Sequence, residues 1–228
     1  MEAINEAITI HYINLFGGIR ISETYLVATI VVLVLIIFAV IFRFLIFPRF
    51  KETPKGFQNF IEMLIEGAHT FAVNRIGKKF GLNAGAYVFT IGAMLITASF
   101  AELIGFKPPM ANLTFTASLA LLSFVLINYY GIRAKGVIGR LKSFAQPKAF
   151  IAPIRVLVDI ALPVSLACRL FGNILGGLVV MDLLYAVIQN FAIGYPAAFA
   201  IYFNLFHIMI QTYIFLNLTF TFAGEAME

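Results

Sequence analysis

The stretch "YLVATIVVLVLIIFAVIF", residues 25–42, contains no charged side chain. As a helix rising about 1.5 Å per residue, this run and the apolar residues after Arg43 are long enough to cross a hydrocarbon core of about 30 Å. The whole chain has the same character, because 61% of its 228 residues are hydrophobic and only 12% are charged. A soluble domain is about half apolar and one quarter charged. The sequence therefore predicts an integral membrane protein.

Further uncharged runs along the chain predict an all-α polytopic fold with about five transmembrane helices. In the last apolar block the best turn signal is "IGYPAA", residues 193–198, which separates two helices expected to form a long tilted hairpin. The chain is interpreted as one membrane domain, residues 1–228, that begins with an external amino-terminal segment, residues 1–24. The expected spans are residues 25–47, 81–104, 113–134, 150–192 and 196–223.

Between the first two spans, residues 54–80 have the pattern of an amphipathic helix that lies in the membrane interface. Thr53 and Pro54 are typical of a helix cap and first helical position. Apolar residues from Phe57 to Ala72 then recur on one helical face, and charges fill the other. His69 lies within this helix, where a solvated or headgroup-facing position is expected.

The basic residues are distributed unevenly between the two sides of the predicted membrane domain. Placing the amino terminus outside puts 13 of the 16 basic residues in cytoplasmic segments and only Arg20 and Lys107 outside. This distribution follows the positive-inside rule and predicts a cytoplasmic carboxyl terminus. Because the charges lie in loops between apolar runs, their function is topological, and nucleic acid is not expected as a partner.

The fourth predicted span is unusually long. A helix over residues 150–192 would measure about 60 Å, roughly twice the hydrocarbon thickness. It must therefore either break, with Pro163 as the candidate position, or lie strongly tilted. Gly172, Gly176 and Gly177 stand at small-residue spacing and would let another helix approach closely.

The remaining basic residue, Arg169, lies inside this span with no acidic neighbour along the chain. A central Arg costs about 2.5–3.5 kcal/mol on insertion scales, and an arginine side chain in a protein keeps its positive charge. One explanation is that Arg169 snorkels or pairs with an acid elsewhere in this chain. The other is that it meets a carboxylate supplied by a partner protein.

The segment around this arginine, "PVSLACRLFGN" (residues 163–173), resembles the signature of subunit a of F-type ATP synthases at every fixed position. "AELIGFKPP" resembles the family's upstream segment with Glu102 in place of Asn. "ANLTFTASLALL" resembles the start of the next span, and "QTYIFLNLTFTF" resembles the last helix. The resemblance implies a stator subunit that provides two ion half-channels and couples proton or sodium flow to ATP synthesis. The implied partners are the c-subunit ring, the b-subunit peripheral stalk and the rest of the complex.

In such a subunit, Arg169 would be the essential arginine that faces the rotor. It would stabilise each ionised carboxylate of the c ring as it passes and, unable to release a proton, would block a leak between the half-channels. The chain would not be an enzyme on its own, because nothing in it resembles a phosphate-binding loop and nucleotide chemistry would reside in other subunits. No cofactor or metal is expected.

Polar residues of the last spans are candidates for the ion pathway. Asn173 lies one turn beyond Arg169, and Leu178 stands where several relatives have a Glu, so Asp182, one turn further, is expected to supply that carboxylate. Gln211 aligns with the family's last-helix Gln. Asp159 and Glu102 both stand near the end of a predicted span. For each of them, an interfacial role and a functional role are both open. The predicted ion pathway comprises Glu102, Asn173, Asp182, Gln189, Asn204, His207 and Gln211.

A secondary ion-coupled transporter is the main alternative, and it would predict internal repeats and a substrate pocket on broken helices. No convincing repeat is present. An intramembrane hydrolase would need a nucleophile motif, and neither Ser165 nor His207 has one around it. The short chain and the lack of a targeting peptide favour the plasma membrane of a bacterium.

Overall fold

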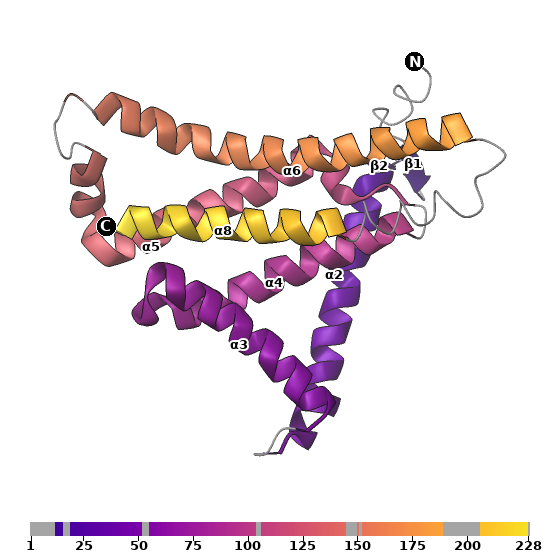
Figure 1. The fold of residues 1–228 in the computed structure, drawn as a ribbon, viewed down its shortest axis with the longest axis horizontal. Coiled ribbons are helices and arrows are strands. Elements are labelled where there is room, and N and C mark those ends of the chain that lie inside the picture. The colour runs from indigo at the N-terminus through magenta and orange to yellow at the C-terminus, as the bar shows by residue number, and fades with distance from the viewer. Residues whose placement is uncertain are drawn as a thin grey trace. The chain divides into compact units, whose positions relative to one another are not determined.

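A computed structural model describes residues 12–15, 19–51, 55–103, 106–144, 150, 152–188 and 206–227. These residues form two compact units, each of which is described by itself. Unit 1 contains residues 1–51, 93–115 and 170–212, and unit 2 contains residues 52–92, 116–169 and 213–228. The elements are labelled in Figure 1. They are β1 (Tyr12–Leu15), β2 (Ile19–Ser22), α2 (Glu23–Ile41), α3 (Phe57–Ile76), α4 (Lys78–Leu103), α5 (Leu113–Phe144), α6 (Ala152–Ile188) and α8 (His207–Met227).

The predicted class, an all-α polytopic membrane protein, is confirmed by long apolar helices. Within the described residues, four helical stretches are long and apolar enough to cross a membrane: Glu23–Arg49, Lys78–Ala101, Leu113–Arg140 and Ala152–Met181. Of the fifth expected span, residues 196–205 lie outside the described part of the chain, and residues 207–223 fall in α8. The placement of five spans in a membrane stays a prediction.

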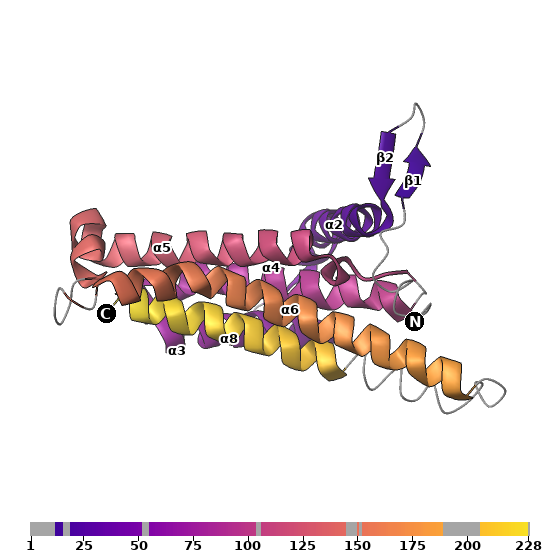
Figure 2. The same ribbon diagram turned by 90° about the horizontal axis from the view of Figure 1, so that it is seen from above.

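The amino-terminal segment contains a short β-hairpin that the sequence did not predict. β1 and β2 pair antiparallel, with Tyr12 opposite Ser22 and Leu15 opposite Ile19, immediately before α2 (Figure 2). Ser22 then caps α2, because its hydroxyl accepts a hydrogen bond of 3.3 Å from the backbone N–H of Tyr25. Strands of four residues are too short for their alternating pattern to stand out in the sequence.

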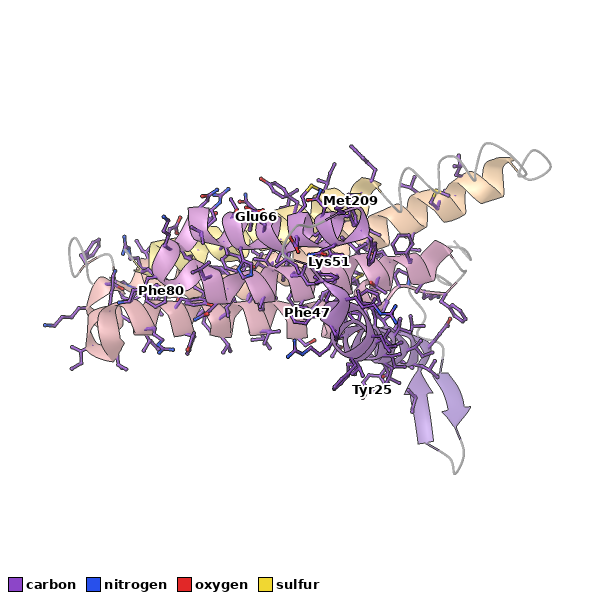
Figure 3. The ribbon with its side chains drawn as sticks, turned by 90° about the horizontal axis from the view of Figure 1, so that it is seen from below. Tyr25, Phe47, Lys51, Glu66, Phe80 and Met209 are labelled. Carbon is purple, nitrogen blue, oxygen red and sulfur yellow. The ribbon has the colours of Figure 1, made fainter. Side chains whose placement is uncertain are left out.

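Helix α2 is apolar around its whole circumference, and most of its side chains are exposed in the described part of the structure. Its apolar window has a mean hydropathy of 3.3 and is only 6% buried. Figure 3 shows side chains projecting on all sides of α2, on which Tyr25 is labelled. Only Val27, Ala28 and Val31 are buried, whereas Ile37 and Phe38 are 56% and 52% exposed. Such a surface belongs in contact with lipid or with another protein.

The helix that the sequence predicts for the membrane interface corresponds to α3. α3 starts at Phe57, and Gly56 before it has a φ of 57°, a conformation that glycine adopts at little cost and that ends the helix there. Thr53 and Pro54, the expected cap and first helical residue, lie outside the described residues. His69 of α3 is part-buried, and its expected solvated or headgroup-facing position stays a prediction. Its Nδ1 is buried, and its imidazole packs against Gly85 of α4, where an added Cβ would overlap it.

Close helix contacts and aromatic rings organise unit 2. An added Cβ at Gly81 would lie 2.5 Å from the Cα of Val73, so glycine is required where α4 meets α3. Phe71 of α3 and Tyr87 of α4 both pack edge-to-face on Phe220 of α8, with ring centroids 6.1 Å apart in each case. The Tyr87 and Ser123 hydroxyls are 2.9 Å apart and link α4 to α5.

Helix α6 runs unbroken from Ala152 to Ile188 through Pro163, so the alternative of a break at this proline is wrong. A proline costs one backbone hydrogen bond, which a helix in a membrane domain tolerates where neighbouring groups compensate. Its 37 residues extend over about 55 Å, well beyond the hydrocarbon thickness. A continuous helix of this length fits a 30 Å core only if it is tilted or projects beyond it.

Candidate functional site

Arg169 lies on the exposed side of α6. Leu166, Leu170 and Ile174 are buried and hold the helix against the rest of the protein. Four exposed residues near the arginine are small: Ser165, Cys168, Gly172 and Gly176. The Arg169 side chain has no hydrogen-bond or ion-pair partner among the residues that the structure describes. Within that part of the chain, the guanidinium therefore remains available to an outside carboxylate.

The glycines that follow Arg169 are not required by the packing of this chain. A Cβ built on Gly172, Gly176 or Gly177 would meet no described atom within 4 Å. Since glycine costs about 1 kcal/mol relative to alanine inside a helix, the cost is not offset by any described internal contact. The resulting smooth surface on α6 matches the expectation that another helix approaches closely at this position.

Two residues of the predicted ion pathway meet within unit 1. The Asn173 amide of α6 donates a hydrogen bond of 2.6 Å to the Gln211 carbonyl oxygen of α8. Gln211 is only 3% exposed, and its Nε2 is buried without a partner in the described part of the chain. Because a buried amide donor left unpaired is costly, this position calls for water or another polar group.

His207 presents a second unpaired atom one turn earlier on α8. Its Nε2 is buried and lacks a hydrogen-bond partner among the described residues. His207 and Gln211 are separated by four residues and thus share one face of α8. Two unpaired polar atoms on one helix face suit a hydrated site, since a bound water usually needs two to four polar partners.

The structure leaves the other predicted pathway residues without a described side chain. Asp182 lies in the backbone of α6 and Glu102 in that of α4. The side chains of these two acids, and the whole of Gln189 and Asn204, are outside the described part of the protein. Their positions on the ion pathway stay predictions. Arg169 and Asn173, which are both described, are one turn apart along α6.

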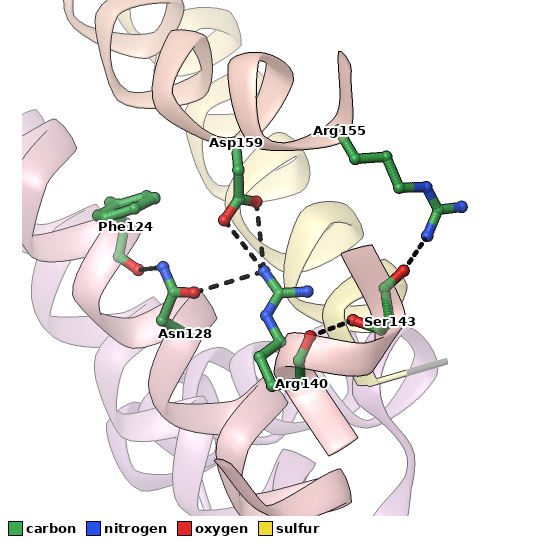
Figure 4. A network of polar contacts seen from close by, with 6 residues as sticks. All are labelled: Phe124, Asn128, Arg140, Ser143, Arg155 and Asp159. Atoms are coloured by element: carbon green, nitrogen blue, oxygen red, sulfur yellow. Dashed lines mark hydrogen bonds and ion pairs between the residues drawn. The ribbon is translucent and has the colours of Figure 1, made fainter. Parts of the chain in front are cut away.

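Sequence reasoning missed a polar network in unit 2 (Figure 4). Arg140, near the end of α5, forms an ion pair of 3.2 Å with Asp159 of α6, and the same nitrogen donates to the Asn128 carbonyl oxygen at 3.4 Å. Asp159, for which two roles were open, thus has a partner in its own chain. Arg155 of α6 donates to the backbone carbonyl of Ser143 at 2.9 Å. In the sequence, the only indication of the Arg140–Asp159 ion pair was that both residues stand near the ends of predicted spans.

Comparison with known proteins identifies the family. Residues 26–224 match the profile of the family described as the ATP synthase A chain. A protein named ATP synthase subunit a from Nitratiruptor sp. is 33% identical over 93% of this chain and 94% of its own length. One from Moorella thermoacetica is 30% identical over 92% of both chains, and a chloroplastic one from Oedogonium cardiacum is 32% identical over 83% and 77%. The chain therefore belongs to the ATP synthase A chain family.

Proposed function

We propose that this chain provides two ion half-channels against the rotating c ring of F-type ATP synthase and couples transmembrane proton or sodium flow to ATP synthesis. Membership of the family makes it a membrane-embedded, non-catalytic subunit of the synthase complex. Within that complex, we propose that the chain belongs to the stator and contacts the rotor. The c ring and the b-subunit peripheral stalk are its proposed direct partners.

The observation that carries the proposal is the exposed Arg169 without a partner in the described chain. At about 4 Å and an effective dielectric near 20, its attraction to an ionised carboxylate is about 4 kcal/mol. A c-ring carboxylate that has bound its ion has no such attraction and moves on. Each ionised site is thus stabilised only while it passes Arg169, and the permanent charge prevents protons from crossing directly.

The surface around Arg169 supports a moving partner. Next to Arg169, the exposed residues Ser165, Gly172 and Gly176 have small side chains or none, so a neighbouring helix can pass this part of α6 at short distance. Large interlocking side chains would oppose rotation because each step would need repacking. The small residues near the arginine therefore suit a sliding contact better than a fixed one.

For the outer half-channel we assign Asn173, His207 and Gln211 as water-ordering groups, together with Asn204. Support comes from the 2.6 Å hydrogen bond between the two amides and from the unpaired nitrogens of His207 and Gln211. Asp182 is assigned the carboxylate that Leu178 does not supply, while Gln189 and Glu102 extend the pathway. A chain of polar groups separated by water can pass a proton or a hydrated ion where a dry apolar interior cannot.

We place the protein in the plasma membrane of a bacterium, with the amino terminus outside and the carboxyl terminus in the cytoplasm. Long apolar helices and the family support a multi-pass membrane protein. The excess of basic residues in the proposed cytoplasmic segments supports the orientation. Bacterial relatives from Nitratiruptor sp. and Moorella thermoacetica, similar over more than nine tenths of the chain, support the compartment.

The test is ATP-driven ion pumping by the whole synthase in inverted membrane vesicles. Arg169→Gln should reduce pumping at least a hundredfold, because losing about 4 kcal/mol of attraction is worth nearly three powers of ten. Arg169→Lys should also reduce pumping strongly, since the compact ammonium group of lysine lacks the planar guanidinium geometry that matches a carboxylate. Arg43→Gln, which removes another exposed arginine from the first helical region, serves as the control and should pump normally.

Assembly must be measured beside pumping. The Arg169→Gln complex should retain its subunits and hydrolyse ATP in detergent, which separates loss of coupling from loss of folding. Normal pumping by Arg169→Gln would remove the arginine from the mechanism and favour the alternative of a secondary ion-coupled transporter.

A further inference from the structure

A cavity of about 480 Å³ lies within unit 2, between the end of α5, the first half of α6 and the end of α8. The established family and the proposed ion pathway leave it without a function. Charged residues and apolar residues both line it. The charged lining consists of Lys135, Arg140, Arg155, Asp159 and Glu225, and the apolar lining includes Phe144, Val158, Leu162 and Phe222.

The charges of this cavity leave a positive excess, because three cations face two carboxylates. Arg140 uses one nitrogen for Asp159 and Asn128, but its Nε is buried and has no acceptor among the described residues. Arg140 is itself only 9% exposed. Arg155 donates to the Ser143 carbonyl and forms no ion pair within the described part of the chain. A monoanion with several acceptor oxygens would neutralise the excess and accept these donors.

The cavity also opens onto an apolar surface of α6. Val158 lines it and is 55% exposed, and Ile154 and Leu157, which lie within one turn on the same helix, are 57% and 69% exposed. A free inorganic anion gains nothing from such a surface. A molecule with an anionic head and hydrocarbon chains would place the head among the cations and lay its chains along α6. The basic lining residues also lie near the ends of the predicted third and fourth spans, where lipid headgroups are found.

We propose that this cavity binds the phosphate of an anionic phospholipid. The phosphodiester lies between Arg140 and Arg155, with Lys135 at the rim, and the acyl chains extend over Ile154, Leu157 and Val158. The phosphate monoanion balances the charge of the cavity and accepts the unused guanidinium donors. The bound lipid thereby ties the last turns of α5 to α6 beside the Arg140–Asp159 ion pair, without taking part in ion transfer.

The experiment uses the full-length protein within the synthase, reconstituted in phosphatidylcholine nanodiscs that contain a small fraction of spin-labelled phosphatidylglycerol. Immobilised label measures bound lipid. Arg155→Gln removes one cationic donor and leaves the Arg140–Asp159 pair intact, so phosphatidylglycerol binding should weaken about fivefold. Lys142→Gln is the matched control, because it removes an exposed basic residue of α5 that does not line the cavity. Its binding should change less than twofold.

Two further arms distinguish a lipid from a free anion. Spin-labelled phosphatidylcholine should show no preferential immobilisation, and millimolar inorganic phosphate should not displace phosphatidylglycerol. Displacement by inorganic phosphate would overturn the lipid assignment in favour of a phosphate ion. Equal phosphatidylglycerol binding by the unaltered chain and Arg155→Gln would overturn the site itself. Pumping should be almost unchanged in Arg155→Gln, so this proposal can fail while the proposed function stands.

Discussion

The hydrogen bond between Asn173 and Gln211 is expected to contribute more to hydration of the ion pathway than to stability. Interhelical hydrogen bonds in membrane proteins stabilise by about 0.6 kcal/mol on average, since polar groups find other partners when they separate. Among the described residues this bond leaves the Gln211 Nε2 without a partner, so the pair presents a donor to water. We therefore expect a large effect on ion flux beside a small effect on stability.

Gln211→Ala tests this expectation. The substitution removes both the partner of Asn173 and the unpaired donor, so passive ion flux through the membrane sector, measured after the soluble sector is stripped, should fall about tenfold or more. The midpoint temperature of complex dissociation should move by only a few degrees. Thr212→Val is the control, because it removes a buried hydroxyl from the next position on α8. A flux unchanged in Gln211→Ala and reduced in Thr212→Val would contradict the assignment.

How far the site could be predicted depends on the residue. Arg169, Asn173 and Gln211 stand out because a charge or an amide inside an apolar run is costly and therefore conspicuous. Arg140 and Asp159 do not stand out, since charges near span ends are ordinary. Their pairing depends on how α5 turns before α6, and helical spacing within one element says nothing about that. Gly136, with a φ of 75°, produces this turn inside the range of α5.

At the scale of the element, α6 has two faces with different requirements. One face, with Leu166, Leu170 and Ile174 buried, holds the helix in the protein. The other carries Arg169 among small residues and has no described neighbour at its glycines. Substitutions on the second face should consequently be harmless to the chain alone and harmful only when its partner is present.

Substitutions at Gly176 are expected to affect the isolated chain and the assembled complex differently. Gly176→Ala should stabilise the isolated chain by up to about 1 kcal/mol, because alanine is the better helix former and its Cβ meets nothing within 4 Å. Gly176→Leu should leave the chain folded but reduce ATP-driven pumping severely, since the side chain would collide with a passing helix. The chain's stability is read from thermal unfolding in detergent, and coupling from inverted vesicles.

The control for this pair is Gly85→Ala on α4. Its Cβ would lie 2.9 Å from the Cα of His69, so the substitution should destabilise the chain itself by about 1–3 kcal/mol. Should Gly176→Leu pump at the normal rate, α6 does not face the rotor at this position.

The elements differ in how well the sequence predicts them, for physical reasons. α2 was evident because eighteen uncharged residues in a row permit little else. The start of α3 at Phe57 depends on the positive φ of Gly56, which the cap-like chemistry of Thr53 and Pro54 does not reveal. The continuity of α6 through Pro163 depends on compensation by surrounding groups, which local propensity does not contain.

At the scale of the whole molecule, the remaining question is which side of the membrane each loop faces. The proposed orientation places the segment between α4 and α5, which includes Phe106, outside. It places the end of α5, which includes Lys142, in the cytoplasm. Both residues are exposed in the structure. The basic excess in the proposed cytoplasmic segments is the only argument for this direction, so it should be tested independently of ion transport.

The single native Cys168 makes that test direct, since Cys168→Ser gives a chain without thiols. In this background, Lys142→Cys should react with a membrane-impermeant maleimide only in inverted vesicles, and Phe106→Cys only in intact cells. The thiol is accessible in each case because the position is exposed, so the side of addition alone determines labelling. The reverse labelling pattern would show that the chain has the opposite orientation in the membrane, so the proposed outer half-channel would be the inner one. Asn173, His207 and Gln211 would then have to be assigned to the cytoplasmic route, although the contact between Arg169 and the rotor would not change.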